Sequence, residues 1–476
     1  MSTHRLVLRT PAQAVVGEPI WALLTAKRAN GRTDFEYSGT VEFSCTDEGA
    51  DLPGPTTVFA CERGRHLFSV TFHRPGEHRL RVRDTDNWLE AESAPIVVTE
   101  APSELNLYWG DLHGHTGEYS CGYGTIDNYY TYARDYAGLD FCALTEHDHL
   151  PGHPRDLSTI WERVKRAARY YNDPHRFVTF LGYEWTSMFR QKPDDERAFF
   201  GQRHVLYLSD DQPWFGCHRP QSDTPEKLWS CLEGREALVV IHHTAAPTQW
   251  GFGWEMWNPD LERLVEIYSV WGSSERPERE GNPYPIRAHG GENDCGHVQR
   301  AFEKGYRLGI CAGGDSHDGS PGDTWAWGKY TLGKGERKRW GEVPYHGGLH
   351  GVWAKELTRE ALWEALLARR CFGTTGARIR VEFFVEGRWM GSELSVPPDA
   401  PRRLRVRVLG TAPLKSVELV KNNEDWRSLP CQGHRCEAEV VDDEPVGDRG
   451  FYYVRVTQAD GEMAWSSPVW VVRGGG

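Results

Sequence analysis

The fold of this chain is decided by the stretch LNLYWGDLHGHT, residues 105–116. Residues 105–109 are typical of a strand, and one aspartate and two histidines follow as soon as that strand ends. The same order, a predicted strand followed by histidine or carboxylate, recurs four times. The later strands are 140–144, 177–181, 237–241 and 308–312, and after them come Thr145-Glu146-His147-Asp148, Gly182-Tyr183-Glu184, His242-His243 and Gly313-Gly314-Asp315-Ser316-His317.

Strands alternate with helices from 105 to about 376. A further strand is predicted at 264–269 and helices at 157–171 and 358–370. This alternation predicts parallel strands in an α/β layer or barrel. Because the carboxyl ends of barrel strands assemble the active site in such folds, we expect the five polar groups to meet there.

The flanking regions have the alternating pattern of β-sheet proteins. Residues 64–72 and 77–84 alternate with period two, and the Pro75-Gly76 turn between them predicts a hairpin. Alternation returns at the end of the chain, in 403–410, 415–422, 451–458 and 467–472. With about 150 residues per domain, the 476 residues suggest three domains. We expect an Ig-like β-sandwich over 1–102, the α/β region over 103–376 and a second all-β domain over 377–476.

Composition excludes several functions. The net charge is −13, which argues against general binding of nucleic acid or anionic lipid, because Lys and Arg supply that affinity. The first residues lack the pattern of a signal peptide, and no run of 18 apolar residues predicts a membrane span. The 11 cysteines are scattered, so reduced thiols and a cytoplasmic location are expected. The oligomeric state stays open.

Histidine nitrogens mixed with carboxylate oxygens suit Zn²⁺, Mn²⁺ or Fe²⁺ better than Mg²⁺ or Ca²⁺, which prefer oxygen ligands. So many titratable groups meeting without a metal would carry large costs of desolvation and repulsion. The residues themselves therefore favour a site for divalent transition metals.

The ordered motifs resemble those of the PHP (polymerase and histidinol phosphatase) superfamily, and most of all its large DUF3604-type members. The stretches that carry the resemblance are 108–116, 138–141, 265–269 and 305–309, within a region of about 105–376. The resemblance implies a distorted (β/α)7 TIM-like barrel that holds two or three divalent metal ions.

The resemblance also implies the ligands. His113 and His115 would bind the first metal, Glu184 would bridge two, and His147 would serve the next metal with His204. The remaining ligands would be His242 or His243, and Asp315 with His317.

Two positions depart from the family pattern. Cys121 stands where an aspartate or histidine is usual, so it is either a thiolate ligand or the mark of a weakened third site. Glu146 stands where an aspartate is usual, and its longer side chain leaves its role as a ligand open.

The leading functional hypothesis is metal-dependent hydrolysis of a small phosphomonoester or phosphodiester. Asp111 and Asp148 are candidates for orienting ligands or transferring protons, and His243 for orienting substrate. Arginines could hold a phosphate bidentately, and the candidates are Arg203, Arg287 and Arg307.

Tryptophans near the motifs allow two interpretations. They either pack loops over the site or form a stacking wall for a sugar, nucleoside or aromatic group of a small-molecule substrate. They are Trp109, Trp185, Trp250, Trp254, Trp257, Trp325 and Trp327.

Two other functions stay open. The same metal centre could cleave a C–N, C–O or ester bond of a substrate without phosphate, or the chain could be a non-catalytic binding protein whose β domains flank a structural barrel.

Overall fold

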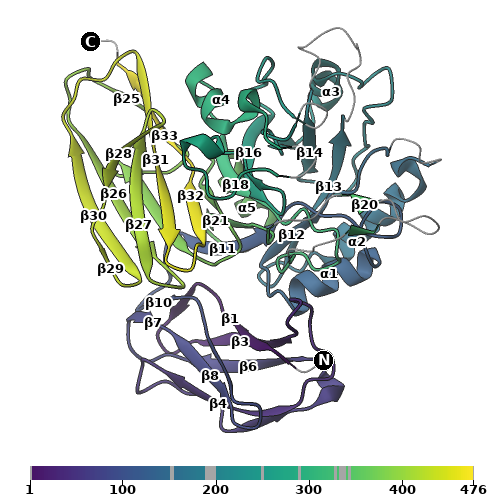
Figure 1. Cartoon of the computed structure of the whole chain (residues 1–476), viewed down its shortest axis with the longest axis vertical. Coiled ribbons are helices and arrows are strands. Elements are labelled where there is room, and N and C mark those ends of the chain that lie inside the picture. The colour runs from purple at the N-terminus through teal and green to yellow at the C-terminus, as the bar shows by residue number, and fades with distance from the viewer. Residues whose placement is uncertain are drawn as a thin grey trace.

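A computed structural model of the chain describes residues 3–150, 155–187, 200–247, 251–287, 291–325, 330–331, 339–340 and 345–474. Strands dominate it, and the helices are few and short. In Figure 1 the N-terminal strands lie below the rest of the chain, and the C-terminal strands stand beside the central sheet.

The N-terminal strands form three small sheets, ordered β1-β3-β6, β2-β10-β7 and β5-β4-β8-β9. Their apolar side chains share one core. The strands are β1 (Arg5–Arg9), β2 (Gln13–Val15), β3 (Pro19–Lys27), β4 (Gly39–Cys45), β5 (Thr56–Val58), β6 (Arg65–Thr71), β7 (Gly76–His78), β8 (Leu80–Asp84), β9 (Leu89–Glu92) and β10 (Ile96–Thr99).

The predicted hairpin at Pro75-Gly76 is wrong. Both segments are strands, but β6 pairs with β3, β7 with β10, and β8 with β4 and β9. Alternation predicts which face of a strand is buried and leaves its partner open. Here Val70 of β6 and Val82 of β8 belong to one core between the sheets instead of lying side by side in one sheet.

The central strands carry the predicted motifs. β11, β12 and β13 pair in parallel, β14 is antiparallel to β13 and β15, and β15, β16 and β18 again pair in parallel. The five motif-bearing strands therefore run in one direction, as the sequence predicts. The central strands are β11 (Asn106–Asp111), β12 (Phe141–Leu144), β13 (Val178–Thr186), β14 (Gln202–Tyr207), β15 (Ala237–His242), β16 (Glu262–Ser269), β17 (Gly272–Ser273), β18 (Gly309–Ala312), β21 (Leu349–Ala354) and β22 (Cys371–Thr374).

The structure does not show the predicted (β/α)7 barrel. The pairings run from β18 through β16 to β11, β21 and β22, and among the described strands none joins β18 to β22. The central strands instead belong to a 16-stranded sheet, since β22 pairs with β32 of the C-terminal part. The described strands that oppose the common direction, β14, β17 and β21, also depart from a purely parallel barrel.

Five short α-helices accompany the described central strands. The predicted helix over 157–171 is a 3-10 turn followed by α2, and that over 358–370 is α5; α1, α3 and α5 begin after threonine caps. None of the helices in the described part of the chain has the length and apolar composition that a bilayer crossing requires. The helices are α1 (Ile126–Asp135), α2 (Trp161–Tyr171), α3 (Pro225–Leu232), α4 (Val298–Lys304) and α5 (Arg359–Leu367).

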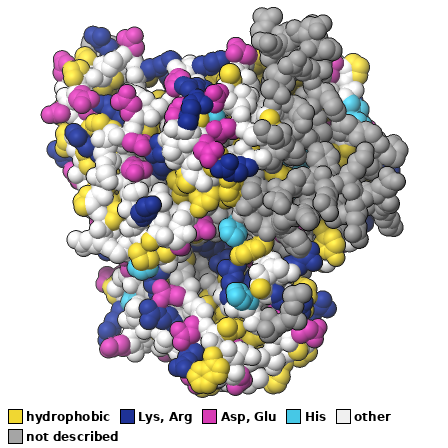
Figure 2. Space-filling view, in the orientation of Figure 1, with side chains coloured by type: hydrophobic (Ala, Val, Ile, Leu, Met, Phe, Trp, Pro, Cys, Tyr) yellow, Lys and Arg dark blue, Asp and Glu magenta, His cyan; other side chains and the backbone are white. Residues whose placement is uncertain are grey.

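The C-terminal strands form one separate sheet, ordered β24-β23-β26-β30-β29, and extend the central sheet through β32, β31, β27 and β28. Acidic and basic side chains are interspersed over their face in Figure 2. The strands are β23 (Arg380–Val385), β24 (Arg388–Trp389), β25 (Glu393–Val396), β26 (Arg402–Leu409), β27 (Leu414–Lys421), β28 (Glu424–Ser428), β29 (Cys431–Gln432), β30 (Arg435–Asp442), β31 (Arg449–Gln458), β32 (Met463–Ser466) and β33 (Val469–Arg473). The short pair β19 (Tyr330–Thr331) and β20 (Arg339–Trp340) completes the described strands. The domain boundaries at 102 and 376 stay predictions.

A buried ion pair ties the N-terminal sheets to the central region. The ammonium of Lys27 lies 2.7 Å from Asp323 Oδ2 and donates to the hydroxyl of Tyr132, also at 2.7 Å. Arg9 reaches the other oxygen of Asp323 at 3.2 Å. These contacts hold the segment that follows Asp315 against the N-terminal sheets.

Candidate metal centre

Asp111, the last residue of β11, braces the loop that carries the first two histidines. Its Oδ1 accepts the backbone N–H groups of His113, at 3.1 Å, and Gly314, at 2.8 Å. Its Oδ2 accepts the N–H of Gly322 at 3.0 Å. Burial raises the pKa of Asp111 to about 6, although these backbone donors lower it. The side chain therefore fastens the loop after β11 to the loop after β18.

Glu184 is the central carboxylate of the cluster. It lies inside β13, opposite His204 of β14, and its side chain is 1% exposed. Burial raises its pKa, but the surrounding histidines hold the pKa well below the usual range. Its oxygens lie 3.2 Å from His147 Nδ1, 3.3 Å from His115 Nε2, 3.6 Å from His242 Nε2 and 3.8 Å from His113 Nε2.

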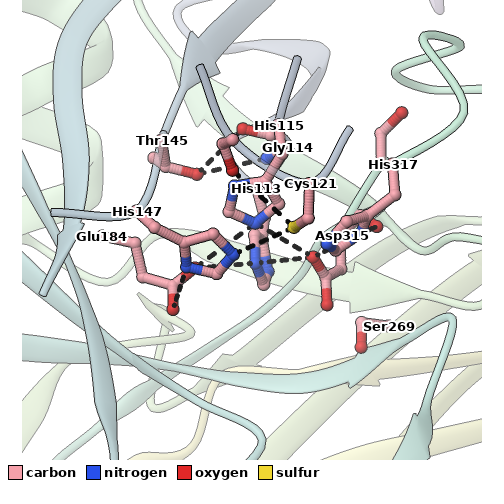
Figure 3. Close-up of polar contacts among 12 residues, drawn as sticks. His113, Gly114, His115, Cys121, Thr145, His147, Glu184, Ser269, Asp315 and His317 are labelled. Atoms are coloured by element: carbon pink, nitrogen blue, oxygen red, sulfur yellow. Dashed lines mark hydrogen bonds and ion pairs between the residues drawn. The ribbon is translucent and has the colours of Figure 1, made fainter. Parts of the chain in front are cut away.

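Asp315 is the second carboxylate that several histidines share. In Figure 3 it lies to the right of the central histidines, and His147 and Glu184 lie to their left. The indole N–H of Trp271 donates to its Oδ2. Its oxygens lie 3.0 Å from His113 Nε2, 3.2 Å from His243 Nε2, 3.2 Å from His317 Nδ1 and 3.3 Å from His115 Nε2.

Two residues of the cluster have left-handed backbone conformations. His243 has φ 49° and Asp315 has φ 45°. Such conformations are uncommon outside glycine and collect at functional sites, where the surrounding structure enforces them. Both residues follow the end of a strand, where the chain turns sharply to direct the side chain inward.

Three overlapping groups of side chains place their donor atoms close enough to share an ion. In each group the donor atoms lie within 4.8 Å of one another, and nearly all the side chains are buried. The groups are His113, Glu184, His204 and His242; His113, His115 and Asp315; and His115, His147 and His317.

Several of these donor atoms lack a hydrogen bond. Among the described residues, no hydrogen-bond partner is found for the buried ring nitrogens of His115, His204 and His242, or for Nε2 of His113. A buried polar atom without a partner costs free energy. A metal ion bound between these ring nitrogens and the neighbouring carboxylates would give the nitrogens a partner. The donor set, nitrogen with oxygen, therefore fits divalent transition ions.

Cys121 lies at the edge of the third group. Its Sγ is 3.2 Å from His147 Nε2. Burial raises the pKa of the thiol, but the neighbouring His317 and His147 bring that pKa well below its usual value. The structure thus places Cys121 beside the predicted ligands, and its own role as a ligand stays a prediction.

Some predicted ligands take other places. His204 groups with His242 and not with His147, and His242, rather than His243, belongs to a donor group. Glu146 belongs to none of the groups found among the described residues; its Oε1 accepts the backbone N–H of Thr116 at 3.0 Å. It therefore braces the loop after His115.

Asp148 belongs to a fourth group, with Cys217 and His218, in which Asp148 is buried and His218 is exposed. Its Oδ1 accepts the backbone N–H of Thr186 at 3.1 Å, and its Oδ2 accepts that of Cys217. Burial raises the pKa of Asp148 to about 7. These bonds anchor two loops next to His147.

The predicted phosphate-binding arginines lie elsewhere. Arg203 is buried and donates to Glu262 Oε1 at 2.6 Å. Side chains alternate along a strand, so Arg203 points to the opposite face of the sheet from its neighbour His204, which faces the cluster. Arg287 pairs with Glu278. Arg307 precedes β18, whereas Asp315 follows it, and it pairs with Glu393. None of these placements supports a phosphate clamp at the cluster.

Glu266 is a functional candidate that sequence reasoning missed. Its carboxylate accepts from His113 Nδ1, at 3.1 Å and 3.0 Å to its two oxygens. The available signal is a carboxylate within the otherwise apolar strand 264–269, since Glu is seldom buried without a partner. Such a bond fixes the tautomer of a histidine and directs its other nitrogen toward a metal.

The described tryptophans mostly pack loops. The indoles of Trp185, Trp254 and Trp257 donate to the backbone carbonyls of Ser222, Gly296 and Glu262. Trp109 is buried, and Trp325 lies under the guanidinium of Arg5. Trp271 is the tryptophan that contacts the cluster, while Trp250 and Trp327 lie outside the described residues.

Fold and site together define a β-rich protein with a buried histidine–carboxylate cluster whose donor atoms could hold metal ions. The family profile for "Protein of unknown function (DUF3604)" matches residues 142–275 and 299–397. This match confirms the resemblance to the DUF3604 family that the sequence motifs carry.

Similar chains occur in chlamydiae. An uncharacterised protein of Chlamydia pneumoniae is 32% identical over 421 residues, and one of Chlamydia trachomatis is 32% identical over 423 residues. Each alignment covers 85% of this chain and 63% of the relative, so the chain spans about 63% of the length of these relatives.

Among solved structures, a two-domain Bacteroides vulgatus protein containing a predicted PHP-like metal-dependent phosphoesterase aligns with a TM-score of 0.38 and 15% identity, over 77% of this chain and 96% of the other. A Paenibacillus cycloisomaltooligosaccharide glucanotransferase aligns with a TM-score of 0.26 and 9% identity, over 98% of this chain and 71% of the other. These scores do not establish a shared fold.

Proposed function

We propose that this chain is a metal-dependent hydrolase of the PHP type, whose cluster holds two or three divalent transition ions and cleaves a small phosphomonoester or phosphodiester. The observation that carries the proposal is the set of buried ring nitrogens that have no hydrogen-bond partner among the described residues, on histidines that form donor groups with Glu184 or Asp315. Zn²⁺, Mn²⁺ and Fe²⁺ suit these donors.

When bound, such ions supply Lewis acidity toward an ester oxygen and activate water near neutral pH. The residues of the chain hold the geometry for this chemistry. Glu184 and Asp315 would each supply an oxygen to one of the two donor groups that share His113, and Glu266 keeps the proton of His113 on Nδ1, which leaves Nε2 as a donor atom. Asp111 holds two of the ligand loops together.

Substrate would approach along Trp271. Its indole contacts Asp315, and its ring centroid lies 6.4 Å from that of His243 and 6.3 Å from that of His317. A flat aromatic surface beside the cluster suits a sugar or aromatic group of the substrate. His243, whose side chain is 11% exposed, is placed to contact the substrate.

The test begins with the metal content of the purified chain, measured by elemental analysis. The protein is then loaded with Zn²⁺, Mn²⁺ or Fe²⁺ and assayed on a panel of phosphoesters. We expect two or three ions per chain and turnover that His113→Ala or Asp315→Ala abolishes while circular dichroism stays unchanged. His434→Ala, which removes an exposed histidine, is the matched control. Protein that binds no transition metal, or loaded protein inactive on the whole panel, contradicts the proposal.

A second candidate keeps the metals and changes the bond, to a C–N, C–O or carboxylic ester bond. It is favoured by the positions of Arg203 and Arg307, which pair with Glu262 and Glu393 instead of facing the cluster. Release of inorganic phosphate, compared with product mass spectrometry on the same substrates, separates the two reactions.

A further inference from the structure

A cavity lies away from the histidine–carboxylate cluster. Its volume is about 320 Å³, within the range of small-ligand pockets. Three arginines, one glutamate and one tryptophan contribute to its wall. The lining residues are Trp257, Pro259, Arg263, Gly305, Arg307, Arg369 and Glu393.

The cavity lies at the opposite end of the central strands from the cluster. Arg263 stands near the start of β16, Arg307 just before β18 and Arg369 just before β22. Asp315, by contrast, follows the end of β18. At about 3.3 Å per residue, the four residues of β18 alone separate the two sites by about 13 Å. The two sites are therefore distinct.

The charges in the wall do not balance. Glu393 accepts from Arg369 Nη2 at 2.8 Å and pairs with Arg307. Three guanidinium groups against one carboxylate leave a formal charge of 3 − 1 = +2. Burial lowers the pKa of Arg369, and the charge of Arg263 lowers it further, so the arginines repel one another within the wall.

The arginines are held in place and still have free donor capacity. Arg263 donates to the carbonyls of Leu367 and Pro259, and Arg369 donates to those of Gly391 and Arg307. Each guanidinium has five N–H donors. Bonds within the described chain use three donors of Arg263, three of Arg369 and one of Arg307.

An aromatic surface completes the wall. Trp257 stacks on Tyr306, with ring centroids 4.6 Å apart and planes 20° apart, and its indole donates to the carbonyl of Glu262 at 2.9 Å. These contacts fix the orientation of the indole. A rigid aromatic face beside guanidinium donors suits a ligand that has both an anionic group and a flat or apolar part.

We propose that this pocket binds the phosphate group of a small phosphorylated molecule, at a site separate from the catalytic cluster. A phosphate carries about −1.5 to −2 charge at pH 7, which matches the +2 charge of the wall. Planar guanidinium groups bind phosphate through paired N–H donors. Arg307 thus binds an anion, as its residue type suggests, but at the end of the sheet away from the metal ligands.

The test is calorimetric titration of inorganic phosphate into the whole chain after a chelator has removed its metal, so that the cluster does not bind phosphate, with two variants that change the charge of the wall in opposite directions. Arg307→Gln lowers the wall charge, and we expect the dissociation constant of phosphate to rise tenfold or more. Glu393→Gln raises the wall charge, and we expect tighter binding. Arg300→Gln is the matched control: it removes an arginine of similar exposure that pairs with Glu303 on α4, and we expect no change.

Damage to the fold would weaken binding in both wall variants, so opposite shifts identify the charge of the wall as the cause. Equal affinity for phosphate in the wild type, Arg307→Gln and Glu393→Gln overturns the proposal. A wild-type pocket that binds acetate as tightly as phosphate also overturns it. His113→Ala removes a cluster residue and is expected to keep this binding. The phosphate pocket and the proposed hydrolase activity are therefore tested independently, and either proposal can be wrong while the other is right.

Discussion

The buried pair of Lys27 and Asp323 offers a quantitative test of how the N-terminal sheets hold the segment after the second ligand loop. The perturbation is Lys27→Met, which keeps the length of the side chain and removes its charge. The side chain of Lys27 is 1% exposed and that of Asp323 is 9% exposed. The variant leaves Asp323 buried, with Arg9 at 3.2 Å as its remaining ion-pair partner in the described part of the chain.

The size of the effect follows from this burial. Removing one partner of a buried pair costs about 3–5 kcal/mol, because the other charge stays desolvated. Since Arg9 remains, we expect about 3 kcal/mol for Lys27→Met. Adding Asp323→Asn removes the stranded charge, so the double variant should recover about 2 kcal/mol of that loss.

The assay is urea unfolding at pH 7, followed by tryptophan fluorescence. The free energy of unfolding is taken from the transition whose midpoint shifts in the variants while its dependence on urea concentration, the m-value, stays constant. Lys27 holds the pKa of Asp323 well below its usual range although burial raises it. A lowered carboxyl pKa stabilises the fold above its unfolded value of about 3.9, and this contribution is lost as the pH falls through the folded value. The pKa of Lys27 is raised, so its contribution is complete below about pH 10.

The difference between wild type and Lys27→Met should therefore be constant between about pH 5 and pH 8 and should shrink in stronger acid. A loss below about 1 kcal/mol for Lys27→Met, or a double variant as unstable as the sum of the single variants, would refute the reasoning.

Three further predictions concern single residues around the site. Glu266→Gln weakens the acceptor of His113 Nδ1, so metal affinity should fall about 10- to 100-fold in a chelator competition; unchanged affinity would remove Glu266 from the site. Gly313→Ala would place a Cβ against Glu266 Oε2, so the metal affinity of this variant should fall in the same assay. An affinity equal to that of the wild type would show that the loop moves to make room for the methyl group. Arg203→Met leaves Glu262 buried without its ion-pair partner and should lower the free energy of unfolding by about 3–5 kcal/mol in urea. Its KM should stay within about twofold of wild type, since a larger rise in KM would mean that Arg203 contacts substrate.

The direction of the strands was predictable and their partners were not. A histidine or carboxylate after an apolar strand marks one end of that strand, which is why the groups around His113, His147 and Asp315 were expected together. Strand β14 lies antiparallel between β13 and β15, however, and alternation or apolar runs do not distinguish such a strand from a parallel one. The same limit explains the wrong hairpin at Pro75-Gly76, since pairing depends on which cores the sheets share.

Within the site, residue type predicted proximity better than role. His204 and Arg203 are neighbours in sequence and both looked functional, but alternation along β14 directs only one of them toward Glu184. Glu266 was missed for the opposite reason, because its strand reads as core and only the contact with His113 reveals why a carboxylate is buried there. Such assignments need the register of the strands, which one sequence does not contain.

The net charge of −13 gains a local meaning from these positions. A negative chain repels anions over its surface, so an anionic substrate needs a place where positive charge exceeds negative charge. Two or three divalent ions would bring about four to six positive charges to a cluster whose shared carboxylates are Glu184 and Asp315. The pocket of Arg263, Arg307 and Arg369 reaches an excess of +2 without any metal. Removal of metal by a chelator should therefore abolish anion binding at the histidine–carboxylate cluster and leave it intact at the arginine pocket. Only the cluster depends on bound metal ions for its positive charge, whereas the charge of the pocket comes from its own side chains.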